Sequence, residues 1–224
     1  MSKKIYVSPS DQIRNEYAAG NTNEKEQCHK ITSALLVALK RCGFQAKTNY
    51  VASMADRVNE SNEWGADLHL PIHTNAHNGK VQGTRLFSYA ETGKGKEACE
   101  AIMETLAPIT PGESDAITTA NFYEIRNAKA PTAYIEVGFH DNAEEAQWIV
   151  DHTKEIAEAI CQGICEFFDV EYKPVVVEKP AEKPQEEATL YRVQVGAFKN
   201  QKLAQALVNR LKAAGFKDAY VKTN

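Results

Sequence analysis

The stretch LHLPIHTNAHNG, residues 68–79, is the most informative part of this chain. Its first five residues have the short apolar composition of a buried strand, and the polar run after them places His73 at the strand end. The stretch AYIEVGFHDN, residues 133–142, has the same plan, with Glu136 in the strand at 133–137. Functional groups in open α/β sheets gather at the carboxyl ends of the strands. Both stretches therefore predict a site at that edge.

Strands and helices alternate on both sides of these stretches. Further strands are predicted at residues 5–7, 44–50 and 83–89, and helices at 24–41, 57–64, 96–106 and about 143–168. Asn23 is a typical N-cap for the first helix, and Gly43 a typical stop. This alternation predicts an α/β fold, namely a three-layer sandwich with a largely parallel central sheet.

A segment rich in Pro, Glu and Lys divides the chain. Residues 173–188, KPVVVEKPAEKPQEEA, hold prolines that break helices and central strands, and they predict an extended linker. A catalytic domain is expected at 1–172 and a smaller unit at 189–224. In the smaller unit, strands at 191–198 and 219–222 flank an amphipathic helix at 202–214, which predicts a small βαβ module.

Charge and hydropathy exclude several classes of partner. The formal net charge is −4 and no block of like charge is present, so no nucleic-acid partner is expected. No run of 18 apolar residues occurs, which argues against membrane insertion. The first residues, MSKKIYVSPS, lack the apolar stretch of a signal peptide. We expect a protein made in the cytoplasm that reaches any external substrate after release.

The five cysteines are odd in number and show no CxxC spacing. They are interpreted as small buried side chains rather than as disulfides or a thiolate metal site, and they indicate a reducing compartment.

Glu136 and His73 are the first candidates for chemistry. A carboxylate within a buried strand pattern is costly unless it is used or paired. A structural reading, in which each side chain merely reaches solvent or a hydrogen-bond partner, stays open for both residues. Glu24, at the start of the first helix, is expected beside the same edge of the sheet. Oxygen and nitrogen donors that converge there suit a catalytic zinc ion, which takes about three protein ligands.

Three motifs in this order resemble the zinc-dependent N-acetylmuramoyl-L-alanine amidases of the amidase-3 type, as found in clostridial phage endolysins and autolysins. The motifs are NTNEKEQ (21–27), IHTNA (72–76) and IEVGFHDN (135–142), and the resemblance covers about residues 4–170. It implies that Glu24 and His73 are zinc ligands and that Glu136 is the catalytic carboxylate. The implied reaction hydrolyses the amide bond between N-acetylmuramic acid and L-alanine in peptidoglycan.

This chain departs from the family where a zinc-binding histidine normally follows the first strand. The stretch here is SPSDQ, residues 8–12, and Asp11 falls at the matching place. Asp11 is therefore the expected third ligand, since aspartate oxygen binds zinc. Gln12 or another histidine is the alternative. Asn75, Arg126 and Asn127 are expected to contact the glycan strand and the stem peptide.

The C-terminal stretch LYRVQVGAFKNQKLAQALVNRLKAAGF, residues 190–216, resembles the first half of a SPOR domain, which binds peptidoglycan glycan strands. A half domain allows a homodimer without requiring one.

Three other functions compete with the amidase reading. The first is a wall-binding protein derived from an amidase that has lost its metal. The second is a metallopeptidase acting within the stem peptide. The third is a cysteine hydrolase, which is disfavoured because every cysteine fits a helical pattern rather than a strand end beside a histidine.

Overall fold

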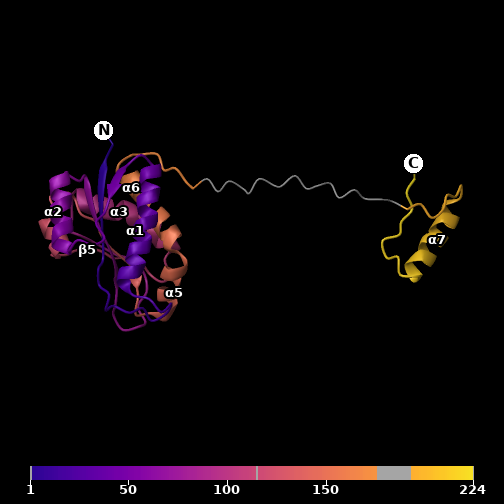
Figure 1. Cartoon of the computed structure of the whole chain (residues 1–224), viewed down its shortest axis with the longest axis horizontal. Helices are drawn as coiled ribbons and strands as arrows, with labels where there is room; N and C mark the ends of the chain where they lie inside the picture. The colour runs from indigo at the N-terminus through magenta and orange to yellow at the C-terminus, as the bar shows by residue number, and fades with distance from the viewer. Residues whose placement is uncertain (1, 115, 176–192, 224) are drawn as a thin grey trace. The chain divides into compact units, whose positions relative to one another are not determined.

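The computed structural model describes residues 2–114, 116–175 and 193–223. It separates into two compact units, Met1–Val175 and Val176–Asn224 (Figure 1). The division falls inside the segment expected as a linker, whose residues 176–188 lie outside the described residues. No helix in the described part of the chain is both long and apolar enough to cross a bilayer.

The described residues of the first unit form a six-stranded sheet. Its order is β2 (Gln45–Lys47), β1 (Lys4–Pro9), β3 (Leu68–Asn75), β6 (Tyr134–Phe139), β4 (Arg85–Ser88) and β5 (Ala116–Thr119). The first four strands in this order are parallel, β4 is antiparallel to β6, and β5 is parallel to β4. The predicted α/β fold with a largely parallel sheet is confirmed.

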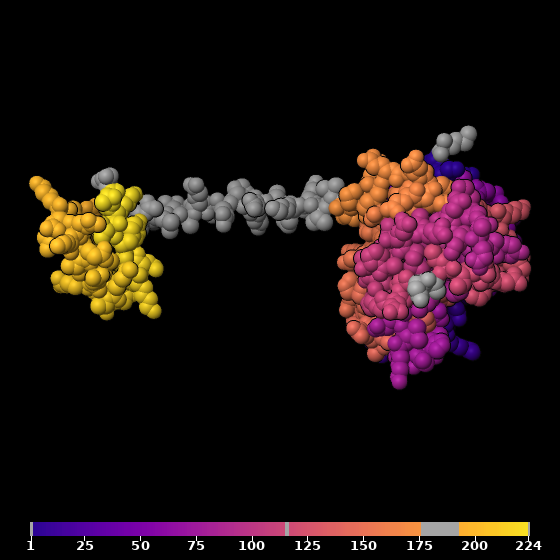
Figure 2. Space-filling model, turned by 180° about the vertical axis from the view of Figure 1, so that it is seen from behind, coloured from indigo at the N-terminus to yellow at the C-terminus, as the bar shows by residue number. Residues whose placement is uncertain are grey.

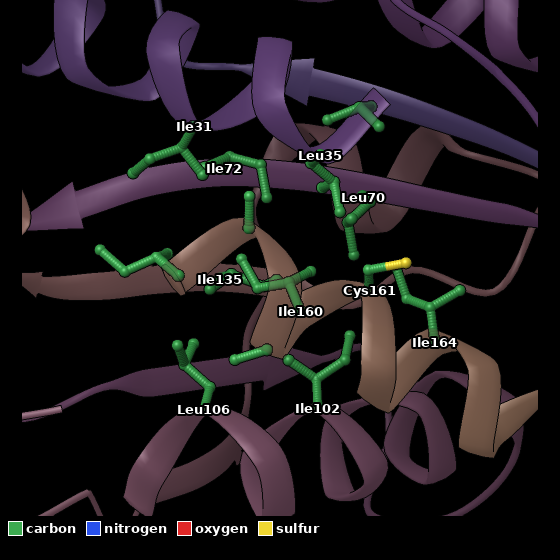
Figure 3. Close-up of a cluster of buried hydrophobic side chains, with 14 of the residues drawn as sticks. Ile31, Leu35, Leu70, Ile72, Ile102, Leu106, Ile135, Ile160, Cys161 and Ile164 are labelled. Atoms are coloured by element: carbon green, nitrogen blue, oxygen red, sulfur yellow. The ribbon is translucent and has the colours of Figure 1, made fainter. Parts of the chain in front are cut away.

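One face of the sheet is apolar. Alternate side chains of the central strands, among them Val7, Leu70 and Ile135, belong to a single buried cluster. Three helices supply many of its other members: α1 (Glu24–Arg41), α3 (Lys94–Leu106) and α6 (Thr153–Phe167). Figure 3 shows side chains of the three helices meeting those of β3 and β6. Burial of this face supplies most of the apolar driving force for folding.

The opposite face carries polar side chains, because the side chains of a strand alternate between the two faces. Ser8, His69 and His73 project there and are buried. The helices α2 (Met54–Trp64) and α4 (Tyr123–Asn127) cover them. Contacts from these helices reach Ser8 and His69 directly. The sheet thus lies between two helical layers, one apolar and one polar.

Helix capping fixes where α1 begins. The side chain of Asn23 accepts a hydrogen bond from the backbone N–H of Glu26 at 3.0 Å. Acidic residues occupy the first turn and basic residues the last, which complements the helix dipole. As a result Glu24 is the first helical residue, and it is completely buried at the carboxyl edge of the sheet.

The long helix predicted at 143–168 is wrong. His152, with φ −115° and ψ 25°, ends α5 (Ala143–Asp151), and α6 starts at the next residue. The apolar spacing continues across this break, so periodicity alone could not reveal it. The strand predicted at 44–50 shrinks to β2, and the short elements β5, α4 and the 3-10 turn η1 (Ala107–Ile109) were not predicted.

The predicted βαβ module is also wrong for the residues that are described. Residues 193–198 and 219–222 form no strand, and Tyr191 and Arg192 lie outside the described residues. Only the helix is present, as α7 (Gln201–Ala213). Two short strands under one helix leave an apolar face and both edges uncovered, which is too little burial to hold a sheet together. Val193 and Val195 accordingly stay 84% and 61% exposed.

Candidate metal centre

Glu24 and His73 meet where α1 begins and β3 ends. Oε1 of Glu24 lies 2.9 Å from Nδ1 of His73, and it also accepts the backbone N–H of Thr74 at 3.4 Å. Asn15 donates to the other carboxylate oxygen at 2.6 Å. Glu24 is fully buried and His73 is 7% exposed. Two side chains separated by 49 residues of sequence therefore form one acid–imidazole pair.

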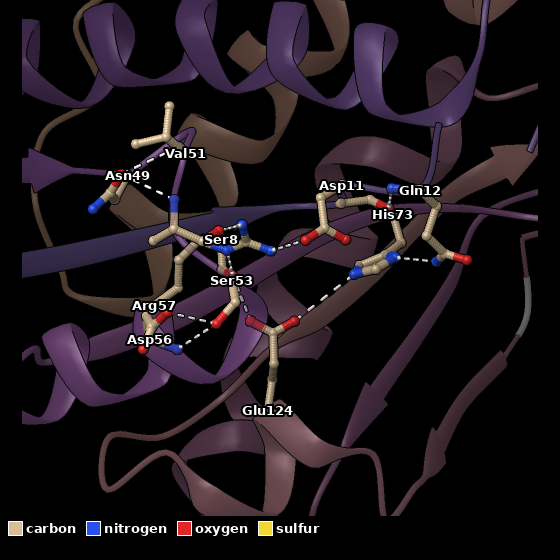
Figure 4. A network of polar contacts seen from close by, with 12 residues as sticks. Ser8, Asp11, Gln12, Asn49, Val51, Ser53, Asp56, Arg57, His73 and Glu124 are labelled. Atoms are coloured by element: carbon tan, nitrogen blue, oxygen red, sulfur yellow. Dashed lines mark hydrogen bonds and ion pairs between the residues drawn. The ribbon is translucent and has the colours of Figure 1, made fainter. Parts of the chain in front are cut away.

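Gln12 completes this group from the loop after β1. Its Nε2 atom lies 3.4 Å from Nδ1 of His73 and 3.5 Å from Oε1 of Glu24 (Figure 4). Its Oε1 accepts from Nδ2 of Asn15 at 3.0 Å, so a metal ligand made from this oxygen would require a half-turn of the amide and the loss of that bond. Loops after β1 and β3 thus converge at one end of the domain, where they form part of its surface (Figure 2).

Asp11, the expected third ligand, is not brought to this pair. Its side chain is half exposed, and its Oδ2 lies 3.8 Å from Nη2 of Arg57. No hydrogen bond or ion pair links Asp11 with Glu24 or His73 in the described chain. The alternative, Gln12, is the residue that the structure places beside them.

Glu136 stands next to His73 across the sheet. The two residues are register partners in the parallel strands β3 and β6, so their side chains share the polar face. Oε2 of Glu136 is buried without a hydrogen bond among the described residues. The pKa of Glu136 is raised to about 8, mainly by burial; the charge of His73 opposes this shift and the charge of Glu24 adds to it. A carboxylate in this range can take up and release a proton near neutral pH.

Glu124, on α4, lies beside the other ring nitrogen of His73. It was not predicted as a site residue from the sequence. Its Oε2 lies 3.8 Å from Nε2 of His73, and its Oε1 lies 3.2 Å from Nε2 of His69. Ser8 donates to the same Oε1, and Arg57 donates to Ser8 at 2.9 Å. Figure 4 shows His73 between Gln12 and Glu124. Buried carboxylates of this kind commonly orient metal-binding imidazoles.

Neighbouring carboxylates raise the pKa of His73. Burial by itself would lower the pKa of His73, but Glu124 and Glu24 beside its two ring nitrogens raise it to about 9. For Glu124, burial opposes ionisation, yet the hydrogen bond from His69 and the nearby imidazole of His73 lower the pKa to about 2. Two carboxylates thus face the two ring nitrogens of His73, and such a negative environment favours a positive charge at this place.

The predicted substrate-binding residues make their hydrogen bonds elsewhere than to Glu24, His73 or Glu136, as far as the described residues show. Asn75 ends β3, and its side chain accepts the N–H of Ala76 at 2.8 Å. Arg126 is exposed on α4. Asn127 contacts Tyr123 through its side chain and Asn62 through its carbonyl. Their roles toward substrate stay predictions.

An aromatic group adjoins the site and also escaped prediction. Tyr134 stacks on His73 with ring centroids 4.7 Å apart, and Phe122 lies 4.9 Å from Tyr134. Phe122 is 42% exposed, although it is a large apolar side chain. Phe122 and Tyr123 directly precede Glu124 in the sequence. This aromatic pair was the signal that could have indicated both the aromatic group and the buried carboxylate of Glu124.

The residues present fit a metal ion. A carboxylate, an imidazole and an amide lie in mutual contact, and a further buried carboxylate oxygen next to them has no hydrogen bond in the described chain. Oxygen and nitrogen donors of this kind suit zinc. Fold and site together define the class: a metal-dependent α/β hydrolase with its site at the carboxyl ends of parallel strands.

Comparison with known families identifies the particular family within this class. The profile of the N-acetylmuramoyl-L-alanine amidase family matches residues 11–166, and the chain belongs to that family. A SPOR domain profile matches residues 172–223. Both expected resemblances are confirmed.

Two proteins of similar sequence are also N-acetylmuramoyl-L-alanine amidases. The chain is 26% identical to the N-acetylmuramoyl-L-alanine amidase CwlM of Bacillus licheniformis, over 97% of this chain and 84% of the relative. It is 26% identical to a sporulation-specific N-acetylmuramoyl-L-alanine amidase of Bacillus subtilis, over 95% and 82%.

Solved structures share the fold. The catalytic domain of the amidase CwlV from Bacillus (Paenibacillus) polymyxa superposes with a TM-score of 0.69 at 20% identity, covering 76% of this chain and all of that one. An N-acetylmuramoyl-L-alanine amidase from Clostridium difficile 630 gives 0.66 at 22% identity, over 75% and 97%.

Proposed function

We propose that this chain hydrolyses the amide bond between N-acetylmuramic acid and L-alanine in peptidoglycan, with a zinc ion held by Glu24 and His73. The observation that carries the proposal is the position of Glu136 opposite His73 in the sheet register, beside the Glu24–His73 pair. Family membership supplies the peptidoglycan amidase activity.

Glu24 and His73 would hold the metal, with Gln12 preferred over Asp11 as the third side chain. The Gln12 amide already lies within 3.5 Å of both other groups, whereas Asp11 contacts Arg57. Glu124 would keep the His73 ring oriented, with its hydrogen bonds to Ser8 and His69 holding the carboxylate still. When bound there, zinc supplies Lewis acidity toward the amide carbonyl and toward a water molecule.

Glu136 would carry the proton of the reaction. Its carboxylate takes a proton from the attacking water as the new C–O bond forms at the lactyl carbonyl. It then delivers that proton to the alanine nitrogen as the C–N bond breaks. Burial raises the pKa of Glu136, so its carboxylate binds a proton more strongly than an exposed carboxylate would, as a proton carrier between water and the leaving nitrogen requires.

The C-terminal unit would add contact with the wall. The SPOR profile over residues 172–223, together with the amidase family, indicates peptidoglycan as the partner. Engagement of glycan strands by this unit, pairing of two chains through it, and action on the wall after release from the cytoplasm are predictions from the sequence.

Digestion of purified cell walls tests the proposed bond. The full chain, loaded with Zn²⁺, is incubated with peptidoglycan, and the released fragments are analysed by mass spectrometry. We expect peptides that begin with L-alanine, together with glycan chains that retain the intact lactyl group. Fragments cut within the stem peptide would identify a metallopeptidase instead. Binding to the wall without any release of peptide would identify a wall-binding protein.

A further inference from the structure

Three of the five cysteines gather at the end of the domain away from the amidase site. Cys42 follows the last turn of α1, and Cys161 and Cys165 lie one turn apart on α6. All five thiols are free and buried, as expected from the sequence. Cysteine, histidine, aspartate and glutamate side chains can all bind metals. Among the described residues, these three cysteines form the group of such side chains whose ligand atoms all lie within 4.8 Å of one another.

The spacing of the three sulfurs is close to that of a metal-bound set. Sγ of Cys161 lies 3.8 Å from Sγ of Cys42. With zinc–sulfur bonds of about 2.3 Å, the sulfurs stand about 3.8 Å apart in a tetrahedral site and about 4.0 Å apart in a trigonal one. Because no pair here exceeds 4.8 Å, small side-chain rotations suffice to bring all three onto one ion.

Two donors point at the sulfur of Cys42. The backbone N–H of Lys173 points at Sγ of Cys42 at 3.4 Å, and the thiol of Cys161 points at the same sulfur. N–H donors to sulfur are typical outer contacts of metal-bound cysteine. The guanidinium of Arg41, the neighbour of Cys42 in sequence, is paired with the carboxylate of Glu158 and donates to the carbonyl of Lys173.

The remaining cysteines show how an isolated core thiol behaves in this fold. Cys99 is fully buried on α3, and its thiol contacts the carbonyl of Phe87 at 3.6 Å. Cys28 is fully buried on α1 among core residues. Both fill the core singly, so core packing alone gives no reason for three thiols to converge.

A short segment covers the three cysteines. Residues 170–173 lie over Cys42 and Cys165, joined by the bond from Val170 N–H to the Cys165 carbonyl at 2.9 Å and by the Lys173 contact. Cys42 is 4% exposed, whereas Cys161 is completely buried in the core, as Figure 3 shows for its sulfur.

The group is separate from the amidase site. Glu24 and Cys42 stand at opposite ends of α1, and 18 residues at 1.5 Å per residue place their backbones about 27 Å apart. No residue is shared between the two groups.

We propose that Cys42, Cys161 and Cys165 form a second metal site, which takes a thiophilic d10 cation such as Zn²⁺ through three thiolates. Each thiol releases its proton to solvent as its sulfur binds the ion, so binding is accompanied by proton release. The bound ion would tie the end of α1 to α6 beneath residues 170–173.

Cadmium binding to the full chain tests this second site, because cadmium–thiolate bonds have an ultraviolet charge-transfer absorption that oxygen and nitrogen ligands do not give. The experiment uses a His73→Ala background to remove a ligand of the amidase site. We expect one equivalent of Cd²⁺ to bind with that absorption. Adding Cys161→Ala abolishes it, whereas adding Cys99→Ala leaves it unchanged.

Two results would overturn the proposal: no thiolate absorption in the His73→Ala chain, or the same absorption after Cys161→Ala. Because Cys161 is a core residue, Cys42→Ser at the end of α1 serves as the second variant. Circular dichroism confirms that each variant is folded. Loss of absorption in folded Cys42→Ser supports the site, and its persistence there contradicts it. Wall digestion by the otherwise unmodified chain is measured separately, so a failure here does not bear on the amidase.

Discussion

Glu136 of β6 lies directly opposite His73 of β3 in the register of two neighbouring parallel strands. Such strands are about 4.8 Å apart, so both side chains project from the same face at close range. The distance between the proposed base and the proposed ligand is therefore set by the hydrogen-bonded backbone. Only Glu24, which enters from the first turn of α1, and Gln12 depend on segments outside the sheet.

Glu136→Gln is expected to lower wall hydrolysis by at least about 100-fold, since loss of a general base typically costs that much or more. The amide has the same shape but cannot take the proton. Zinc content, measured by metal analysis, and the thermal midpoint should stay close to those of the parent chain. Glu155→Gln, exposed on α6, is the matched control and should keep full activity. Normal wall clearance by Glu136→Gln would show that another group moves the proton.

Gln12→Ala is expected to weaken zinc binding more than Asp11→Ala, because Gln12 is the side chain in contact with the Glu24–His73 pair. Gln12→His should tighten binding, since imidazole is a better zinc ligand than an amide oxygen. Competition with a chromophoric chelator measures all three affinities. A large loss in Asp11→Ala with none in Gln12→Ala would make Asp11 the third ligand.

Glu124→Gln is expected to weaken zinc binding by about 10- to 100-fold, the usual cost of losing an outer-shell partner of a metal-binding histidine. It should also lower the free energy of unfolding by about 1–3 kcal/mol, because the hydrogen bonds from His69 and Ser8 would end on a neutral amide oxygen in place of a charged carboxylate. Ser8→Ala removes one bond to the same carboxylate and should cost less on both measures. Unchanged affinity in Glu124→Gln would mean that His73 is oriented by its other contacts.

The pH dependence of that stability difference has a definite sign. The pKa of Glu124 is lowered to about 2 in the folded chain, against an ordinary value of 4.5. A lowered pKa means that the carboxylate adds stability above about pH 4.5, and that this contribution is lost as the pH falls toward 2. Denaturant titrations of the metal-free chain at pH 7 and pH 3.5 should show the difference between Glu124→Gln and the parent shrinking at the lower pH.

Much of this arrangement was accessible from the sequence because it depends on local rules. The apolar strand at 68–72 and the N-cap Asn23 locate His73 and Glu24, and parallel strands bring their ends to one edge. Glu136 stood out as a carboxylate within a buried strand. These features need only periodicity and capping, which adjacent residues reveal.

The remainder depends on contacts between distant residues. Glu124 lies on a five-residue helix with no periodic signal, and its importance comes from His69 and His73, which lie more than 50 residues away in sequence. The preference for Gln12 over Asp11 depends on the direction each side chain takes after β1. The break at His152 leaves the apolar spacing intact, so only its backbone angles reveal it.

Gly163→Ala should destabilise the domain although alanine favours helices. A Cβ at this position of α6 would lie 2.6 Å from Cα of Ile102 and 2.7 Å from the carbonyl oxygen of Ala101, both backbone atoms of α3. The gain in helix propensity is at most about 1 kcal/mol, whereas overpacking typically costs about 1–3 kcal/mol and here requires two helices to separate. We therefore expect a net loss of about 1–2 kcal/mol and a lower thermal midpoint. Gln162→Ala, exposed on the same helix, should change the midpoint little. A midpoint for Gly163→Ala equal to or above that of the parent would mean that α3 and α6 are less tightly packed than the structure shows.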